Sequence, residues 1–319
     1  MRSSEPIRPS SRRGASGAWN RLKPVREDVL ETYGLPSKGE TRLNDFKTQE
    51  VYLNRIVERY MKLCALNREE LDRLFASMSS ASASLTCSFS SLSLSLSNPS
   101  SASGLASSKY ASEDRLPTRS TATQPSINEL ATVLQALRKL REAITASART
   151  DVFARRAYYF NIHVAILCHD WESYVPALHS LLSTLHPSNP LPPHDLRDFV
   201  GLQILDQACR QSDYAGARAT KLRYDFVDRR VDAVLRALVA DDWVTFWRMR
   251  RSVDGYQRSV MQWADGRVRV HALKCIGKSY MRADKRFVER STERGWDELV
   301  GDGVGWELDG ERVVIQKLK

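Results

Sequence analysis

VGWELDGERVVIQK, at residues 304–317 near the end of the chain, has the pattern of a β-hairpin. The dipeptide Asp309-Gly310 at its centre tolerates the positive φ angles of a tight turn. Apolar residues alternate on both sides of this turn, namely Val304, Trp306 and Leu308 before it and Val313 and Ile315, with Val314 opposed, after it. Because a lone hairpin is marginally stable in water, we expect these strands to pack on neighbouring elements.

Three helical segments precede the hairpin and are the elements on which it can pack. The first covers about residues 266–281, and two shorter segments follow at about 284–292 and 294–300. Three helices followed by a two-stranded wing make a winged helix. We therefore predict a winged helix over residues 266–319.

The chain between residues 125 and 265 has one helical pattern after another. Ser126 and Glu129 form a capping box, and Asp151 is suited to cap the next helix. Helices of about 11 to 18 residues joined by short turns are antiparallel neighbours in space. No strict repeat period is present, so we predict an irregular array of helical hairpins, similar to a tetratricopeptide array, with a Pro-rich loop at residues 187–193. The predicted fold class is thus mostly α.

The first 124 residues divide into three segments by composition. We expect a disordered basic arm at residues 1–40, an amphipathic helix at 41–76 and a Ser-rich low-complexity linker at 77–124. For the apolar stripe of this helix we favour packing on the chain's own core over docking onto a partner. The stripe consists of Phe46, Leu53, Ile56, Val57, Tyr60 and Cys64. In the linker, the apolar residues that alternate with serine are Leu85, Cys87, Phe89, Leu92, Leu94 and Leu96.

Length, charge and cysteine usage indicate a soluble protein of the cytoplasm or nucleus. The chain has 319 residues and a net charge of +10, about half of which lies in the basic arm. It contains no run of about 18 apolar residues, so we expect no membrane span. The basic N-terminus lacks the apolar segment of a secretory signal, and Glu5 with Pro6, Pro9 and Gly14 argues against a mitochondrial presequence. Five cysteines without a C-x-x-C spacing indicate reduced thiols.

Two stretches carry a resemblance to a known family. RVDAVLRALVADDWVTFWRMRRSV (230–253) sets Asp242, Trp243 and Phe246 after a Leu-Ala helix. KSYMRADKRFVERS (278–291) and GVGWELDGERVVIQK (303–317) form the terminal element. An irregular helical array that runs directly into a small winged helix resembles the PCI domain. The closest likeness is to the small PCI subunits of the proteasome lid, the signalosome and translation initiation factor three. It covers about residues 126–319, while the first 125 residues and the Pro-rich loop depart from it, as in a divergent paralogue.

This resemblance implies a role for the chain. PCI domains act as non-catalytic scaffold subunits of multi-subunit complexes, and their winged helices pair edge to edge through the hairpins. The resemblance therefore implies other PCI-domain subunits as partners. The PCI proteins of messenger-RNA export and splicing, which pair with a small acidic cofactor protein, are the alternative. They imply binding of RNA or another single strand.

The sequence offers no set of residues typical of an enzyme. His163, Cys168 and His169 lie close together, but they lack the paired spacing of zinc ligands and fit a buried histidine and thiol better. Asp241-Asp242 is better explained as a helix cap than as a catalytic carboxylate pair. No nucleophile or phosphate-binding motif is present. We therefore expect no catalytic residue, no cofactor, no metal and no small-molecule substrate.

Charge on the predicted winged helix argues against reading of duplex DNA. Its third helix carries Glu293, Asp297 and Glu298, which have the wrong sign for phosphates and are offset only by Arg290 and Arg294. Basic residues gather instead on a neighbouring face that we expect to meet an acidic partner, with phosphate backbone as the alternative. This face consists of Arg248, Arg250, Arg251, Lys274, Lys278 and Arg282.

The wing supplies the candidates for a protein interface. Trp306 is the first of these, because tryptophan is favoured among residues that dominate binding energy at interfaces. The other candidates are Val304, Val313 and Ile315. The remaining tryptophans are expected in the helical core rather than as platforms for stacked bases.

Overall fold

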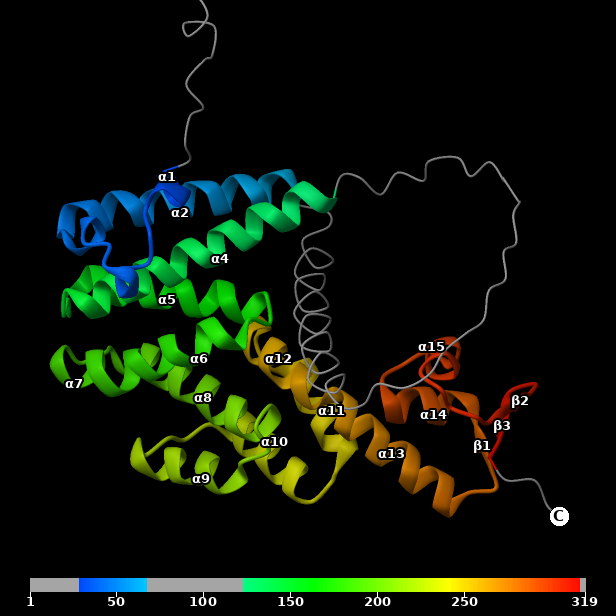
Figure 1. The fold of residues 1–319 in the computed structure, drawn as a ribbon. Coiled ribbons are helices and arrows are strands. Elements are labelled where there is room, and N and C mark those ends of the chain that lie inside the picture. Colours follow the sequence, from blue (N-terminus) through cyan, green and yellow to red (C-terminus); the bar gives the residue numbers. More distant parts are fainter. Residues whose placement is uncertain (1–28, 68–122, 316–319) are drawn as a thin grey trace, which may run out of the picture.

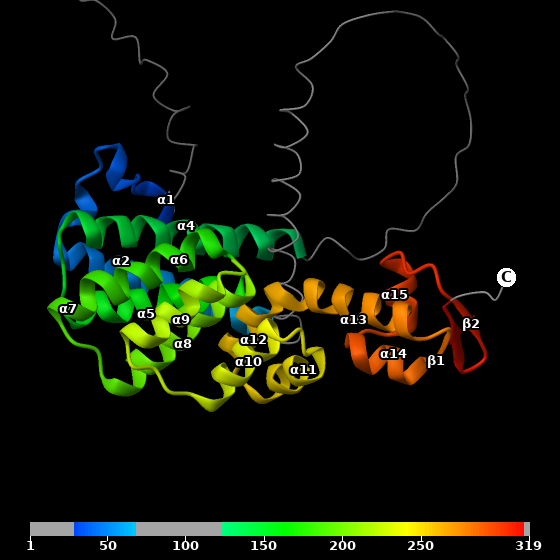
Figure 2. The ribbon, with the colours of Figure 1, turned by 90° about the horizontal axis from the view of Figure 1, so that it is seen from below.

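The computed structural model describes residues 29–67 and 123–315. Within them the protein is mostly helical, with a small three-stranded antiparallel sheet at the C-terminal end (Figures 1 and 2). The prediction of a mostly α fold is confirmed. The residues outside the described part are 1–28 of the predicted basic arm, 68–76 of the predicted amphipathic helix, all but the last two residues of the predicted Ser-rich linker with its alternating pattern, and those after Ile315. Residues 29–40 were predicted to be disordered, and this is wrong: they form the helix Val29–Thr32 and a 3-10 turn at Pro36–Lys38, because Leu30 is buried in the core.

The first helices form one layer, along the top of Figure 1. They are α1 (Val29–Thr32), α2 (Phe46–Leu66) and α4 (Thr123–Ala146), with 3-10 turns at Pro36–Lys38 and Arg42–Asn44. Asp45 starts α2 by accepting a hydrogen bond from the backbone N–H of Thr48 at 3.0 Å. Leu53 and Ile56 are buried against α4 and its neighbours, and Val57 and Tyr60 pack partly against the same cluster. Most of the stripe of α2 therefore packs on the chain's own core, as favoured from the sequence. Phe46 departs from this, because at the first position of α2 it is 48% exposed.

The start of α4 differs from the prediction. The helix begins at Thr123, and Ser126 therefore lies inside it rather than at its cap. Glu129 does not serve a capping box; its carboxylate accepts from the guanidinium of Arg59 on α2 at 2.5 Å. Glu129 thus forms an ion pair between α2 and α4 in place of the cap that the local pattern predicted.

The next helices pack in consecutive pairs beneath this layer. They are α5 (Val152–Leu167), α6 (Trp171–Ser180), α7 (His186–Ser188), α8 (Pro193–Cys209), α9 (Tyr214–Arg223), α10 (Arg229–Val239), α11 (Trp243–Ser252) and α12 (Gly255–Met261). Contacts join α5 to α6, α8 to α9 and α10 to α11. The π turn Leu181–Leu185 carries α6 on into α7, so the chain stays helical to Ser188, two residues into the predicted Pro-rich loop.

Aspartate side chains begin many of these helices. Asp151 accepts from the N–H of Ala154 at 3.0 Å, which confirms the predicted cap of α5. Asp242 accepts from the N–H of Thr245 at 3.0 Å, so the interpretation of Asp241-Asp242 as a cap is confirmed as well. Such caps satisfy backbone donors that the first turn of a helix leaves without partners.

Two hydrophobic clusters form the interior. The larger one extends from Leu30 to Val268 and includes α2 together with the helices down to α12. We call α1 to α12 the helical body. The smaller cluster contains Ile276, Ala283, Val288, Trp296, Leu299 and Val313. Helix α13 (Asp265–Ser279) contributes Val268 to the first cluster and Ile276 to the second, so it links the two.

The C-terminal unit, residues 282–315, follows α13. It contains β1 (Arg282–Asp284), α14 (Lys285–Thr292), α15 (Trp296–Gly301), β2 (Glu307–Asp309) and β3 (Arg312–Val314). The strand order is β1-β3-β2, with Val313 opposite both Ala283 and Leu308. The predicted hairpin is confirmed, with Gly310 at a φ of 60° in its turn. Strand β1 is a third strand, in addition to the two of the predicted hairpin.

Candidate interaction surfaces

Trp306 packs on α13 at Gly277, where the absence of a side chain leaves room for its ring. Its ring is half-buried against the smaller cluster. A Cβ atom added to Gly277 would lie 3.2 Å from Cζ2 of this ring, which is tighter than ordinary contact. Glycine at this position therefore lets the ring lie directly on the α13 backbone. Part of Trp306 remains accessible, while the rest holds the hairpin on the helix.

The four predicted interface residues have different surroundings. Val313 is 0% exposed, because β3 is the central strand and its side chain points into the smaller cluster. The prediction of Val313 as an interface residue is therefore wrong for this fold. Val304 and Ile315 are partly buried against the same cluster. They pack the hairpin against this cluster, so only part of their surface is accessible to a partner.

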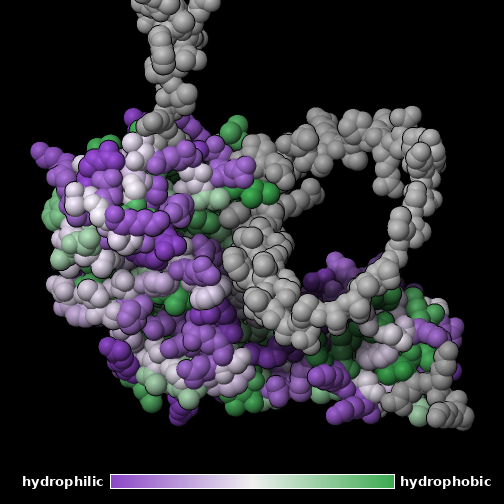
Figure 3. All heavy atoms as spheres, viewed as in Figure 1, coloured by the Kyte–Doolittle hydropathy of each residue, from purple (hydrophilic) through white to green (hydrophobic). Residues whose placement is uncertain are grey.

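The apolar side chain that the wing presents most openly is Leu308, 41% exposed in the outer strand β2. Val300 on α15 is also exposed, and apolar residues are visible on the C-terminal unit beside hydrophilic ones in Figure 3. Leu308 belongs to the predicted apolar alternation but was not among the predicted interface residues. The available signal was its position directly before the Asp309-Gly310 turn, at the end of the hairpin.

The predicted basic face is divided by the fold. The guanidinium of Arg250 forms an ion pair with the carboxylate of Asp265 at 2.8 Å, and both side chains are largely buried. Arg251 forms an ion pair with Glu293 at the end of α14. Arg250 is therefore part of the contact between α11 and α13, and its assignment to an open basic face is wrong. Arg251 stays 59% exposed, but its charge is paired with Glu293.

The other members of this face stay exposed. Lys274 and Lys278 lie one turn apart on α13, about 6 Å along its axis, and Arg282 begins β1. None of the three has an ion pair with any of the residues that the structure describes. Arg248 is exposed on α11, where its guanidinium lies 3.4 Å from the hydroxyl of Thr245. The exposed row that remains is thus Lys274, Lys278 and Arg282.

Helix α14 is joined to the helical body at its C-terminal carbonyl groups. The Nε1–H of Trp247 donates to the oxygen of Ser291 at 3.0 Å, and Nε of Arg269 donates to the oxygen of Thr292 at 3.0 Å. These carbonyls belong to the last turn of the helix, which has no intrahelical donors for them. A guanidinium at this end also interacts favourably with the helix dipole. We refer to these contacts, with Arg250–Asp265 and Arg251–Glu293, as the joint.

Asp265 is the titratable group at the centre of the joint. Burial raises its pKa to about 6, although Arg250, Arg269 and Arg294 oppose this shift. Its Oδ1 atom is buried without a hydrogen-bond partner. Burial also lowers the pKa of Arg269, and the nearby charge of Arg294 adds to this effect. The joint therefore contains charges that are only partly compensated.

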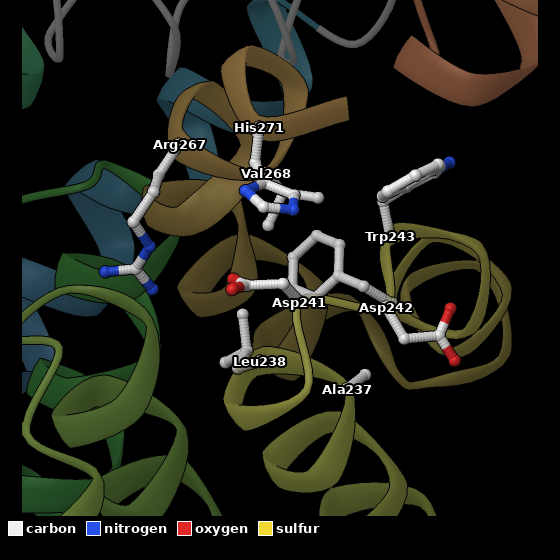
Figure 4. A pocket seen from close by; sticks show the side chains of 9 residues that line it. Ala237, Leu238, Asp241, Asp242, Trp243, Arg267, Val268 and His271 are labelled. Atoms are coloured by element: carbon white, nitrogen blue, oxygen red, sulfur yellow. The ribbon is translucent and has the colours of Figure 1, made fainter. Parts of the chain in front are cut away.

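A small pocket lies beside the joint, between the end of α10, the start of α11 and α13. Figure 4 shows Arg267 and His271 extending from α13 on one side of it and Trp243 and Asp242 at the start of α11 on the other. Its volume of about 80 Å³ suits a few water molecules rather than a substrate. The pocket brings charged groups of both signs together, but it offers no nucleophile paired with a base.

The histidines and thiols singled out from the sequence have core surroundings. The ring of His163 is stacked between those of Phe199 and Tyr256, with centroids 5.5 and 4.2 Å away, and burial lowers its pKa. Cys168 is buried, which raises the pKa of its thiol far above the usual range. Residues 29–67 and 123–315 contain no group of three or more His, Cys, Asp or Glu side chains that could hold a metal ion.

Comparison with known proteins leaves the family open. No protein-family model matches the chain. No curated protein matches it either. In the part of the chain that the structure describes, no helix combines the length and the apolar character needed to cross a membrane.

Proposed function

We propose that this chain is a non-catalytic scaffold subunit of a multi-subunit complex, related to the small PCI subunits that its sequence resembles. It would join partner subunits, themselves PCI-domain proteins, through the C-terminal unit and the neighbouring face of the helical body. The element order helix, strand, helix, helix, strand, strand from α13 to β3 supports a winged helix at this end. The consecutive pairing of helices in the body supports the helical-array part of the proposal.

The observation that carries this proposal is the outer strand β2 with its open apolar side chain. An outer strand offers backbone groups to which another chain can add a strand. Leu308 lies at the centre of β2 and gives such a partner an apolar contact. The joint supports the same role, since it fastens the C-terminal unit to the body by contacts from both α11 and α13.

A charge placed on the outer strand tests this proposal. Leu308→Lys should abolish co-purification of PCI-domain subunits with the tagged chain expressed in its own cells, because a lysine blocks strand addition. Leu222→Lys on α9 is the matched control, since Leu222 is exposed and far from the sheet (Figure 1). If the unaltered chain recovers no PCI-domain subunit, or Leu308→Lys recovers as much as the unaltered chain, the scaffold proposal fails.

A second candidate function, binding of single-stranded RNA, is favoured by the exposed row Lys274, Lys278 and Arg282. Lysines without acidic partners can neutralise phosphates, and such binding weakens steeply with salt. Reversal of all three charges to glutamate should lower affinity for a single-stranded oligonucleotide at least tenfold at moderate salt. Reversal of the exposed Arg218, Arg229 and Arg236 is the control with equal charge change. Equal effects of the two reversals would exclude a specific role of the row.

A further inference from the structure

A groove lies on the helical body, lined by α8 and the connection from α9 to α10. These elements are away from the sheet that carries the proposed scaffold contacts (Figures 1 and 2). The groove runs between the first turns of α8 and the segment that connects α9 to α10, and its volume is about 320 Å³. Volumes of this order are typical of ligand sites in proteins. Its floor consists of Leu196, Val200 and Phe226, and its rim includes Arg197, Asp225 and Val227.

The wall formed by the α9–α10 connection is held rigidly. Asp225 has a φ of 46°, the N–H of Phe226 donates to the oxygen of Lys221 at 2.9 Å, and the N–H of Asp225 donates to that of Leu222. This pair of bonds past a left-handed residue is a Schellman motif, which ends a helix in one defined conformation. The groove therefore exists before anything binds, so a ligand would not need to order this segment.

Phe226 is in turn seated on α8. A Cβ atom added to Gly201 would lie 3.3 Å from Cζ of the Phe226 ring, so glycine lets the ring approach the helix backbone closely. Phe226 is buried, and Val200 beside it is buried as well. By contrast Val227, the next residue along, is 71% exposed at the rim. The groove thus has a fixed apolar floor and an apolar rim that is open to solvent.

The rim also carries one charge of each sign. The guanidinium of Arg197 and the carboxylate of Asp225 are exposed, and neither has an ion pair or side-chain hydrogen bond with any residue in the described ranges. The neighbouring acids of α8 are occupied: Asp195 accepts from the hydroxyl of Tyr159 at 2.8 Å, and Asp198 lies 3.4 Å from His194. The apolar lining and these two unengaged charges, Arg197 from α8 and Asp225 from the α9–α10 connection, define the complementary ligand.

We propose that this groove binds a short extended peptide of a protein partner. One bulky apolar side chain of the peptide would fill the floor, an acidic residue on one side of it would pair with Arg197, and a basic residue on the other side would pair with Asp225. Opposite charges across an interface set the orientation and choice of the partner more than its affinity. The apolar anchor supplies most of the binding energy, as buried anchors do in general.

Selection from a display library of random ten-residue peptides on the full chain tests this proposal. The expected result is enrichment of peptides with an acidic and a basic residue flanking one large apolar residue. A synthetic peptide of the enriched sequence should lose at least tenfold in affinity, measured by fluorescence anisotropy, toward Val227→Asp. Leu222→Asp is the matched control, because Leu222 is also 71% exposed but does not line the groove.

Charge exchange makes the test specific. Arg197→Glu should weaken the peptide at least fivefold, and a peptide whose acidic residue is replaced by lysine should recover most of that loss on the same variant. Enriched peptides without the charged flanks, or equal binding to Val227→Asp and the unaltered chain, would overturn the proposal. So would a dimer of the chain that Val227→Asp dissociates while no peptide is enriched. These outcomes do not depend on Leu308, so they are separate from the test of the scaffold role.

Discussion

The indole Nε1–H of Trp247 on α11 donates a hydrogen bond of 3.0 Å to the main-chain oxygen of Ser291 on α14. Trp247 is buried, and Ser291 lies in the last turn of a helix whose final carbonyls have no partner within the helix. This contact connects the larger hydrophobic cluster with the C-terminal unit. The position of the proposed scaffold surface relative to the helical body therefore depends on it.

Trp247→Phe should destabilise the protein by about 1–2 kcal/mol. The ring still fills most of its space, but a buried carbonyl oxygen loses its donor, which costs about this much. We expect urea unfolding followed by circular dichroism to show the loss. Amide hydrogen exchange should rise more in residues 285–301 than in α5, because the change loosens the joint first.

Trp171→Phe serves as the control for this change. Trp171 is 44% exposed and its ring lies under the guanidinium of Arg210, so its indole contributes little to the interior. Its replacement should alter stability by less than about 0.5 kcal/mol. Equal stability of the Trp247→Phe variant and the unaltered chain would show that the joint does not depend on this hydrogen bond.

Asp265 should make stability depend on pH in the direction opposite to most carboxylates. Its pKa is raised from 3.8 to about 6 in the folded protein, so the folded state holds the proton more tightly than the unfolded chain. The stabilisation from this proton is complete below about pH 4 and is lost as the pH rises through about 6. A shift of this size corresponds to about 3 kcal/mol at most.

Asp265→Asn isolates this contribution. Its amide remains neutral at every pH, so the difference in unfolding free energy between the two proteins should change between pH 4 and pH 6.5 and stay constant above that range. Arg250, Arg269 and Arg294 surround the group and stay charged throughout, so they do not add a titration of their own. A difference that is constant over the whole range would contradict the raised pKa.

Asp206 is a buried carboxylate on α8 that connects this helix to α6 by a hydrogen bond. Its carboxylate accepts from the hydroxyl of Tyr174 at 2.6 Å, from the guanidinium of Arg210 at 2.7 and 2.9 Å, and from the amide of Gln211 at 2.8 Å. Asp206→Ala leaves buried donors without an acceptor and should cost about 3–5 kcal/mol in chemical unfolding. On the same helix, Asp198→Ala removes an exposed carboxylate beside His194 and should cost less than about 1 kcal/mol.

Features set by neighbouring residues were predictable from the sequence, and features set by distant ones were not. The caps Asp151 and Asp242 and the Asp309-Gly310 turn depend on two to four consecutive residues, and each was predicted correctly. Strand β1 was missed because it has three residues, of which only Ala283 is buried, so it has no alternation to detect. Its pairing partner β3 begins 28 residues later in the chain.

The candidate surfaces also depend on contacts between residues that are distant in the sequence. Lys274, Lys278 and Arg282 are exposed, as the predicted basic face requires, but nothing in the sequence indicated that Arg250 and Arg251 would meet Asp265 and Glu293. The groove between α8 and the α9–α10 connection was missed entirely. It depends on the close approach of Phe226 to Gly201, two residues that no periodic pattern links. Surfaces made by tertiary contact are therefore the part that the sequence leaves undetermined.

Arg149 is the residue whose loss should separate α2 from the rest of the body. Its side chain is 3% exposed, and its guanidinium pairs with Glu50 at 2.6 Å and Asp151 at 2.8 Å. It also lies over the rings of Phe46 and Phe153, 4.4 and 4.0 Å from their centroids. Arg149→Met keeps the apolar volume but removes these interactions, so we expect a loss of about 2–4 kcal/mol in urea unfolding.

The control for Arg149 is an arginine that also pairs with a carboxylate but is exposed to solvent. Arg138 on α4 pairs with Glu142 at 3.1 Å with half of its side chain exposed, so Arg138→Met should cost less than about 0.5 kcal/mol. In the Arg149→Met variant, hydrogen exchange should rise in residues 46–66 before it rises in α5, because α2 loses its polar anchor to the α4–α5 turn. Equal losses in the two variants would mean that α2 is held by its apolar stripe alone.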